Sequence, residues 1–221
     1  MQITELTLFT DNISETKNFY GNILSLKIIS QSDNQVGFQA GSTKLIFKEC
    51  KNTQKPFYHF AFNIPSNKLT EAIGWMAEKV NLLPTDENSF IANFKNWNAK
   101  SIYFFDAAGN IAELISRFDL KNETGEKFNS SQILCVSEIG IVSNDLHSIK
   151  QKLINDYKVS DFVKSVNSDT FSAMGDDNGL LILAVENRNW YPTTMPSQKS
   201  PFQIKFINDL NESYVITEEI V

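Results

Sequence analysis

The sequence predicts an α+β protein in which one unit, a strand followed by a helix and three further strands, occurs three times. Each copy opens with an apolar strand, passes through a polar turn into a segment with helical spacing, and ends in three short strand-like runs. The opening strands of the first and third copies share a pattern, because residues 5–8 and 138–141 both run acidic, branched, small, branched. The 17 phenylalanines among 221 residues suit packing between strands. Together these observations predict repeated βαβββ modules.

The first module is expected over about residues 1–50. Residues 3–9 alternate as a strand does, and residues 10–12 form a polar turn. The helix that follows has apolar residues close to helical spacing, namely Ile13, Phe19, Tyr20, Ile23 and Leu24. Three strands are then expected at residues 26–30, 36–40 and 44–48.

The second module is expected over about residues 57–119. A strand at 58–64 and a break at 65–67 precede one helical face, formed by Leu69, Ile73, Met76 and Val80. Three strands follow at residues 89–94, 101–105 and 110–117. The turn before the last strand contains Gly109, which suits a tight hairpin because that turn needs a positive φ.

A polar linker at residues 120–132 leads to the third module, which with a C-terminal tail spans residues 133–221. It has a strand at 135–142, a helical face formed by Leu146, Ile149, Leu153 and Tyr157, and strands at 162–166, 170–174 and 180–185. One more strand is expected at 202–207, outside the repeat.

Composition excludes several classes of protein. A net charge of −6 argues against nucleic acid as a partner, because phosphate binding needs clustered lysine and arginine. No apolar run approaches the ~20 residues of a spanning helix, and the first residues do not resemble a signal peptide. With only Cys50 and Cys135, no disulfide framework is expected. The sequence therefore indicates a cytoplasmic protein that binds neither nucleic acid nor membrane, and scattered glycines exclude a dinucleotide-binding loop.

Three stretches carry a resemblance to a known family. They are Asn-Phe-Tyr at 18–20 with Ile-Leu at 23–24, Tyr-His-Phe-Ala-Phe at 58–62, and residues 104–114. The last is similar to Phe-x-Asp-Pro-x-Gly-Asn-x-x-Glu, with Ala107 in place of the proline. On these residues the chain resembles the vicinal oxygen chelate superfamily, which groups glyoxalase I, extradiol ring-cleaving dioxygenases and bleomycin- or fosfomycin-resistance proteins.

The resemblance implies a fold and a metal site. Two βαβββ modules would form a curved mixed sheet around a cleft, making residues 1–119 one glyoxalase/dioxygenase-like domain and the third module an extra half. By position, Glu5, His59 and Glu113 would hold one divalent ion (Fe, Mn, Ni, Co or Zn), with Leu45 where a fourth ligand would lie. Glu113 would also serve as the catalytic base. Two carboxylate oxygens and one imidazole nitrogen would leave coordination positions of the ion open for water or substrate.

Each of these residues has a structural alternative. Glu5 could be a solvated strand residue, His59 a structural histidine, and Glu113 a surface carboxylate. His147, in the first turn of a helix, is expected at the surface. Glu138 mirrors Glu5, but Leu183 stands where its matching carboxylate would lie, so a structural role is expected. Residues 187–192, with Arg188 and two aromatic residues, could bind an anionic or aromatic ligand, although a loop packed on its own sheet is favoured.

Two functions follow from the resemblance. The first is a metal-dependent enzyme, a lyase or isomerase or a ring-cleaving dioxygenase, acting on a small substrate with adjacent oxygens. The second is a metal-free protein that sequesters a small molecule. In both, a substrate pocket is expected from Phe9, Phe47, Phe62, Trp97 and Tyr103. The third module is open to several roles, including pairing with a second copy of the chain in a homodimer.

Overall fold

The structure, a computed structural model, describes residues 1–50 and 54–220. The first module has the predicted order. Its helical segment begins at Asn12, whose side chain accepts a hydrogen bond from the backbone N–H of Glu15 at 3.0 Å. The elements are β1 (Gln2–Thr10), α1 (Ile13–Lys17), the π-helical turn η1 (Asn18–Ile23), β2 (Lys27–Ser32), β3 (Gln35–Ala40) and β4 (Thr43–Glu49).

The second module has the predicted strand, helix and three further strands, with the first of the three shorter than expected, and adds the two-residue strand β6, which was not predicted. Its elements are β5 (His59–Ile64), α2 (Leu69–Ala77), β6 (Leu82–Leu83), β7 (Ala92–Phe94), the 3-10 turn η2 (Lys95–Trp97), β8 (Ala99–Phe105) and β9 (Ile111–Arg117). Gly109 has φ +83°, as predicted for the β8–β9 turn. The strand predicted at 89–94 is reduced to β7, and both β6 and β7 pair with β8.

The third module lacks one predicted strand. After the 3-10 turns η3 (Phe118–Leu120) and η4 (Ser130–Gln132) come β10 (Cys135–Val142), α3 (Leu146–Tyr157), β11 (Phe171–Asp176), β12 (Gly179–Ala184), β13 (Gln203–Ile207), β14 (Ser213–Thr217) and the turn η5 (Glu218–Ile220). The strand predicted at 162–166 was wrong: Phe162 is buried, but Val163 and Val166 are 93% and 75% exposed, so the segment lacks the alternating buried face of a strand in a sheet.

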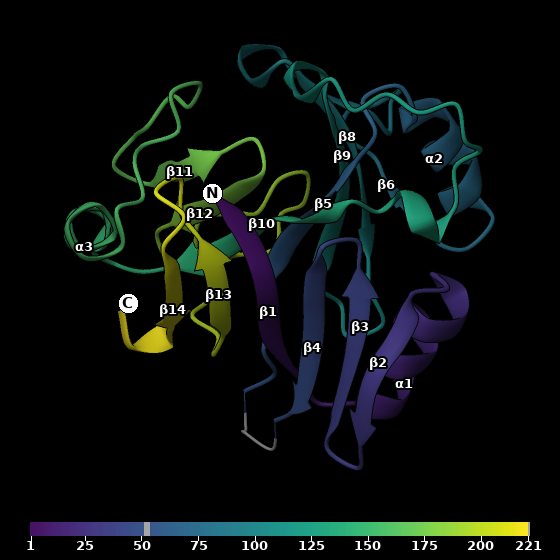
Figure 1. Ribbon diagram of the computed structural model, residues 1–221, viewed down its shortest axis with the longest axis horizontal. Helices are drawn as coiled ribbons and strands as arrows, with labels where there is room; N and C mark the ends of the chain where they lie inside the picture. The colour runs from purple at the N-terminus through teal and green to yellow at the C-terminus, as the bar shows by residue number, and fades with distance from the viewer. Residues whose placement is uncertain (51–53, 221) are drawn as a thin grey trace.

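The strands form two sheets (Figure 1). One is six-stranded in the order β14-β13-β1-β4-β3-β2, and the other is eight-stranded in the order β11-β12-β10-β5-β9-β8-β6, with β7 beside β8. Both have parallel and antiparallel neighbours, and the few helices lie around them, which confirms the predicted α+β class.

The pairing of the modules differs from the expected one. The second module joins the third, because β5 pairs antiparallel with β10 of the third module. On its other side, β5 pairs parallel with β9 of its own module. The first module instead receives the hairpin β13–β14, whose strand β13 pairs antiparallel with β1. Just after the linker, Leu134 bonds to both of the other modules: its N–H donates to the Asn63 carbonyl at 2.8 Å, and its carbonyl accepts from the Ser42 N–H at 2.9 Å. The third module thus extends the sheet of the second module, and the tail hairpin extends that of the first, all within one chain.

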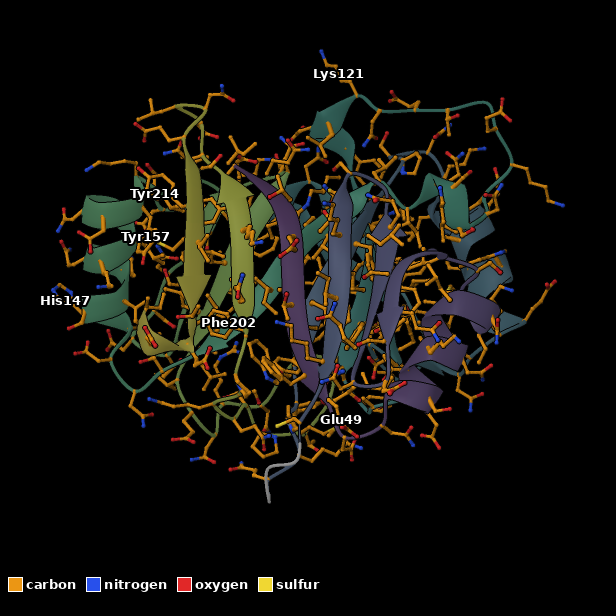
Figure 2. The ribbon with its side chains drawn as sticks, turned by 60° about the horizontal axis from the view of Figure 1, so that its bottom comes forward. Glu49, Lys121, His147, Tyr157, Phe202 and Tyr214 are labelled. Carbon is orange, nitrogen blue, oxygen red and sulfur yellow. The ribbon has the colours of Figure 1, made fainter. Side chains whose placement is uncertain are left out.

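The tail hairpin is covered by the third module's helix. Figure 2 shows Tyr157 of α3 beside Tyr214 of β14, and their ring centroids lie 5.6 Å apart. His147 points outward from the same helix and is exposed, as predicted. The main core lies between the two sheets, because apolar side chains from β1 and β4 pack with those from β5, β9 and β10 in one cluster. No helix of the described residues is long and apolar enough to span a membrane.

The two thiols differ in burial, which predicts different reactivity. Cys50 is half-buried, whereas Cys135 is buried and its thiol lies 3.8 Å from the carbonyl of Asn178. Burial raises the pKa of the Cys135 thiol to about 11.

In a Cys50→Ser variant, Cys135 is the remaining cysteine. At pH 8 we expect it to be ionised roughly two-hundredfold less than an unperturbed cysteine, and to be alkylated by iodoacetamide correspondingly slowly. Mass spectrometry should find a rate that rises about tenfold per pH unit above pH 8; a rate that is already level at pH 9 would contradict the burial of this thiol.

Candidate metal centre

Three ionisable side chains converge on one face of the eight-stranded sheet. His59, Glu113 and Glu138 come from the adjacent strands β5, β9 and β10, all are buried, and their potential ligand atoms lie within 4.8 Å of one another. The His59 Nε2 atom is 3.6 Å from Glu113 Oε2 and 4.0 Å from Glu138 Oε2. Two carboxylates and an imidazole at this spacing match the donors that divalent transition metals bind.

The imidazole of His59 is oriented by the backbone. Its Nδ1 lies 3.2 Å from the carbonyl oxygen of Ile111, the strand neighbour of His59 on β9. A carbonyl can only accept, so Nδ1 carries the proton and Nε2 presents its lone pair to the two carboxylates. Burial lowers the pKa of His59 to about 4, which keeps the ring neutral at neutral pH. A neutral imidazole held in this way is the form that binds a metal.

Glu113 is placed by the predicted β8–β9 turn. Asp106 closes the turn by accepting from the N–H groups of Ala108 and Asn110 at 2.9 and 2.8 Å. The resulting register sets Glu113 opposite Tyr103. Glu113 Oε1 is buried without a hydrogen-bond partner among the described residues. Burial and the neighbouring Glu138 carboxylate raise the pKa of Glu113 well above its usual range. An orphaned carboxylate oxygen is costly, and a bound cation would compensate for it.

Glu138 divides its two oxygens between a cation and the cluster. Its Oε1 accepts a hydrogen bond from Arg117, while Oε2 is the oxygen nearest His59. Burial raises the pKa of Glu138, and the Arg117 guanidinium opposes that shift. Arg117 is fully buried and also donates to Asn63 Oδ1 at 3.1 Å and Asp177 Oδ1 at 3.4 Å. This network keeps Glu138 pointing at the cluster.

Aromatic side chains wall the cluster. The Trp190 and Tyr103 rings lie 5.3 and 6.1 Å from the His59 ring. Trp190 reaches this position because of Gly140: a Cβ there would come within 2.7 Å of the indole. Burial and the charge of Glu113 raise the pKa of Tyr103, so its hydroxyl stays protonated.

A cavity of about 540 Å³ opens over the cluster. This volume lies in the range of small-molecule sites. Its lining combines the three ionisable residues with aromatic, apolar and polar side chains: His59, Asn93, Phe94, Lys95, Asn96, Trp97, Tyr103, Glu113, Glu138, Ser165, Val166, Phe171, Ile182, Arg188, Trp190 and Tyr191.

Comparison with known proteins identifies the family. The chain is 30% identical over 118 residues to the metallothiol transferase FosB of Staphylococcus haemolyticus, a match that covers 51% of this chain and 81% of that protein. The FosB of Staphylococcus epidermidis is 29% identical over the same shares. The chain belongs to the vicinal oxygen chelate superfamily.

Among solved structures of this superfamily's fold, a Bacillus subtilis protein provisionally assigned as a dioxygenase aligns over 90% of this chain and 65% of its own length. The TM-score is 0.61 and the sequences are 14% identical, so this likeness supports the fold alone. No family model matches the sequence.

The structure brings together two of the three metal ligands implied by the superfamily resemblance. His59 and Glu113 lie in the cluster, and Glu138 lies where Glu5 was expected. Glu5 is on β1 in the other sheet, where its Oε1 pairs with Lys205 Nζ at 2.8 Å. The reason is the module pairing: the partner strand of β5 is β10, so β10 supplies the third side chain.

The expected pocket residues also separate into two groups. Trp97 and Tyr103 line the cavity. Phe47 and Phe62 are fully buried in the core between the sheets, and Phe9 lies on β1 of the other sheet. Strand alternation explains Phe62, because His59, Ala61 and Asn63 lie on one face of β5 while Phe62 lies on the other face, in the core between the sheets.

Proposed function

We propose that this chain is a divalent-metal-dependent enzyme that acts on a small molecule with two adjacent oxygen atoms. His59 Nε2 and one oxygen each from Glu113 and Glu138 would hold the ion. When bound, such an ion polarises substrate oxygens as a Lewis acid. The observation that carries the proposal is the convergence of a neutral, backbone-oriented imidazole with two buried carboxylates at the floor of a cavity of small-molecule size. The name of the FosB relatives, metallothiol transferase, also supports a site that uses a metal.

Within this proposal, proton transfer is the chemistry that the side chains favour. Glu113 Oε1 has no other partner in the described part of the chain, and the pKa of Glu113 is raised by burial and Glu138. A carboxylate whose pKa is raised is a stronger base than a free glutamate once it is ionised. Tyr103, opposite Glu113 and protonated, can donate a hydrogen bond to a substrate oxygen. We therefore favour an isomerase or lyase in which Glu113 is the base.

A metal-free binding protein is the second candidate. The observation in its favour is that Arg117 already neutralises Glu138, so the site can exist without an ion. Aromatic rings along the cavity would then hold the ligand.

Metal analysis of untagged protein separates the two candidates. Elemental analysis after incubation with Mn²⁺, Fe²⁺, Ni²⁺, Co²⁺ or Zn²⁺ should find about one tightly held ion per chain, lost in His59→Asn. The sequence offers a matched control, because His147 is its second histidine and is exposed on α3. His147→Asn should retain the ion. Protein that takes up no ion would reject the enzyme and leave the binding protein. An ion held equally in His59→Asn would mean that the cluster of His59, Glu113 and Glu138 is not the metal centre.

A further inference from the structure

The cavity contains a cation that has no counter-charge. Arg188 lines the cavity and is half-buried, and its guanidinium lies over the Phe171 ring at 4.8 Å. Its side-chain hydrogen bond goes to the carbonyl of Asn189 at 3.3 Å, and it forms no ion pair with a described residue. Burial lowers the pKa of Arg188, with no carboxylate to oppose the shift. A desolvated guanidinium in this state favours an anionic partner.

The carboxylates of the same cavity do not supply that charge. Glu138 is paired with Arg117, and Glu113 lies next to His59. Neither comes within ion-pair distance of Arg188, so the guanidinium is free to bind something that enters the cavity. The other cation in the lining, Lys95, is exposed and can keep its own hydration.

The cavity that Arg188 shares with the cluster has an aromatic wall. Ring contacts run from Trp97 to Phe94 at 5.7 Å, from Phe94 to Tyr191 at 6.1 Å, and from Tyr191 to Tyr103 at 5.6 Å. Trp190 continues this wall to His59. Flat apolar surfaces of this kind bind an aromatic or other planar apolar body.

We infer that the substrate of this site is an acid with a planar, apolar body, and that Arg188 is the specificity-determining residue that binds its carboxylate or equivalent oxyanion. The guanidinium offers a planar fork of donors that fits such a group bidentately. The aromatic wall holds the body. The inference rests on the proposed function for what happens at the three-residue cluster, but the anion site itself needs no metal.

Two probes that differ by one charge test the inference: 3-phenylpropanoate and the neutral 3-phenylpropan-1-ol. Binding is followed by fluorescence of Trp97 and Trp190, which both line the cavity. In EDTA-treated protein, where the acid cannot bind a metal, we expect the acid to bind about tenfold or more tightly than the alcohol. Equal dissociation constants in the wild-type protein overturn the inference without any variant.

The variants then assign the preference to one side chain. Arg188→Gln should remove the preference for the acid and leave the affinity for the alcohol unchanged, while Arg188→Lys should keep part of the preference. Lys100→Gln is the matched control for net charge, because Lys100 is exposed on β8 and does not line the cavity. A preference that survives in folded Arg188→Gln, or disappears in Lys100→Gln, overturns the assignment.

The two proposals fail independently. Protein that binds no divalent ion but prefers the acid through Arg188 would retain the anion site and lose the metal enzyme. Protein that binds the ion through His59 but treats acid and alcohol alike would retain the enzyme and lose the anion site.

Discussion

Glu113→Gln is expected to weaken binding of the divalent ion by at least about a hundredfold, which corresponds to about 2.7 kcal/mol. The substitution keeps the size and shape of a buried side chain, so the lost affinity reports the loss of the negative charge and not a cavity. Isothermal titration with Mn²⁺ and Zn²⁺ measures it directly. Catalytic activity should fall in parallel, because the same carboxylate is the proposed base.

The control for this change is Glu5→Gln. Glu5 occupies the position that the superfamily resemblance implies for a ligand, but it pairs with Lys205 in the other sheet. We expect unchanged affinity in Glu5→Gln. Loss of the ion there, with retention in Glu113→Gln, would mean that the metal centre is not the cluster of His59, Glu113 and Glu138.

The pH dependence of the same variant gives a second measurement. The pKa of Glu113 is raised by burial and by Glu138, so the folded metal-free protein retains a proton that an exposed glutamate has lost. Metal binding must release that proton, and the affinity of the wild-type protein should therefore rise with pH until the raised pKa of Glu113 is passed. Glu113→Gln has no such proton and should lack this contribution to the slope.

The raised pKa of Glu113 should make the free energy of unfolding of the metal-free protein fall as pH rises, whereas metal affinity rises. A carboxyl whose pKa is raised on folding stabilises the fold below the pKa of the unfolded chain, and this contribution is lost as pH rises through the folded pKa. The Glu113→Gln variant has no carboxyl at this position, so its stability does not undergo this pH-dependent loss. Urea unfolding in EDTA should find the variant gaining stability relative to the wild-type protein as pH increases, with no gain at pH 4.

The sequence predicts those parts of the site that depend on local patterns. His59 begins an alternating strand, and Glu113 follows a turn whose Asp106 and Gly109 determine the register of the next strand. The parallel pairing of β5 with β9 belongs to one βαβββ module, so both residues reach the same sheet whichever module lies beside them.

Glu138 depends on long-range pairing, which local patterns do not contain. Whether β5 lies beside β1 or β10 is a pairing between segments far apart in the sequence, and here β5 pairs with β10 while Leu134, just before β10, bonds to both Asn63 and Ser42. The likeness of residues 138–141 to residues 5–8 was the available signal. The argument against Glu138 was Leu183, which lies in the core and supplies no ligand; the second carboxylate comes from β9 instead.

The two sheets are built alike, yet one of them contains the cluster. In each, a central strand has a parallel neighbour from its own module and an antiparallel neighbour from a later segment. Around β5 these neighbours contribute Glu113 and Glu138. Around β1 the antiparallel neighbour contributes Lys205, which satisfies Glu5 with a cation from the protein itself. A lysine at that position removes the need for a metal ion.

Arg117→Met is expected to cost about 3–5 kcal/mol of the free energy of unfolding of the metal-free protein, because it leaves the buried Glu138 without its cation. Urea denaturation at pH 7 measures the loss. The control is Lys164→Met, which removes a partly exposed partner of Asp119 and Asp177 and should cost about 1 kcal/mol or less. Adding Glu138→Gln to Arg117→Met should recover part of the loss; an equal loss in the double variant would contradict a cost that arises from the unpaired carboxylate.

The same variant connects stability to metal binding. In the wild-type protein Arg117 and the ion would share the charge of Glu138, one at each carboxylate oxygen. Without Arg117 the ion is the cation that remains to neutralise that carboxylate. Because a ligand stabilises the state to which it binds, saturating Mn²⁺ or Zn²⁺ should raise the stability of Arg117→Met by more than it raises that of the wild-type protein. A smaller rise would mean that Arg117 assists the ion by orienting Glu138 more than it competes with the ion for that charge.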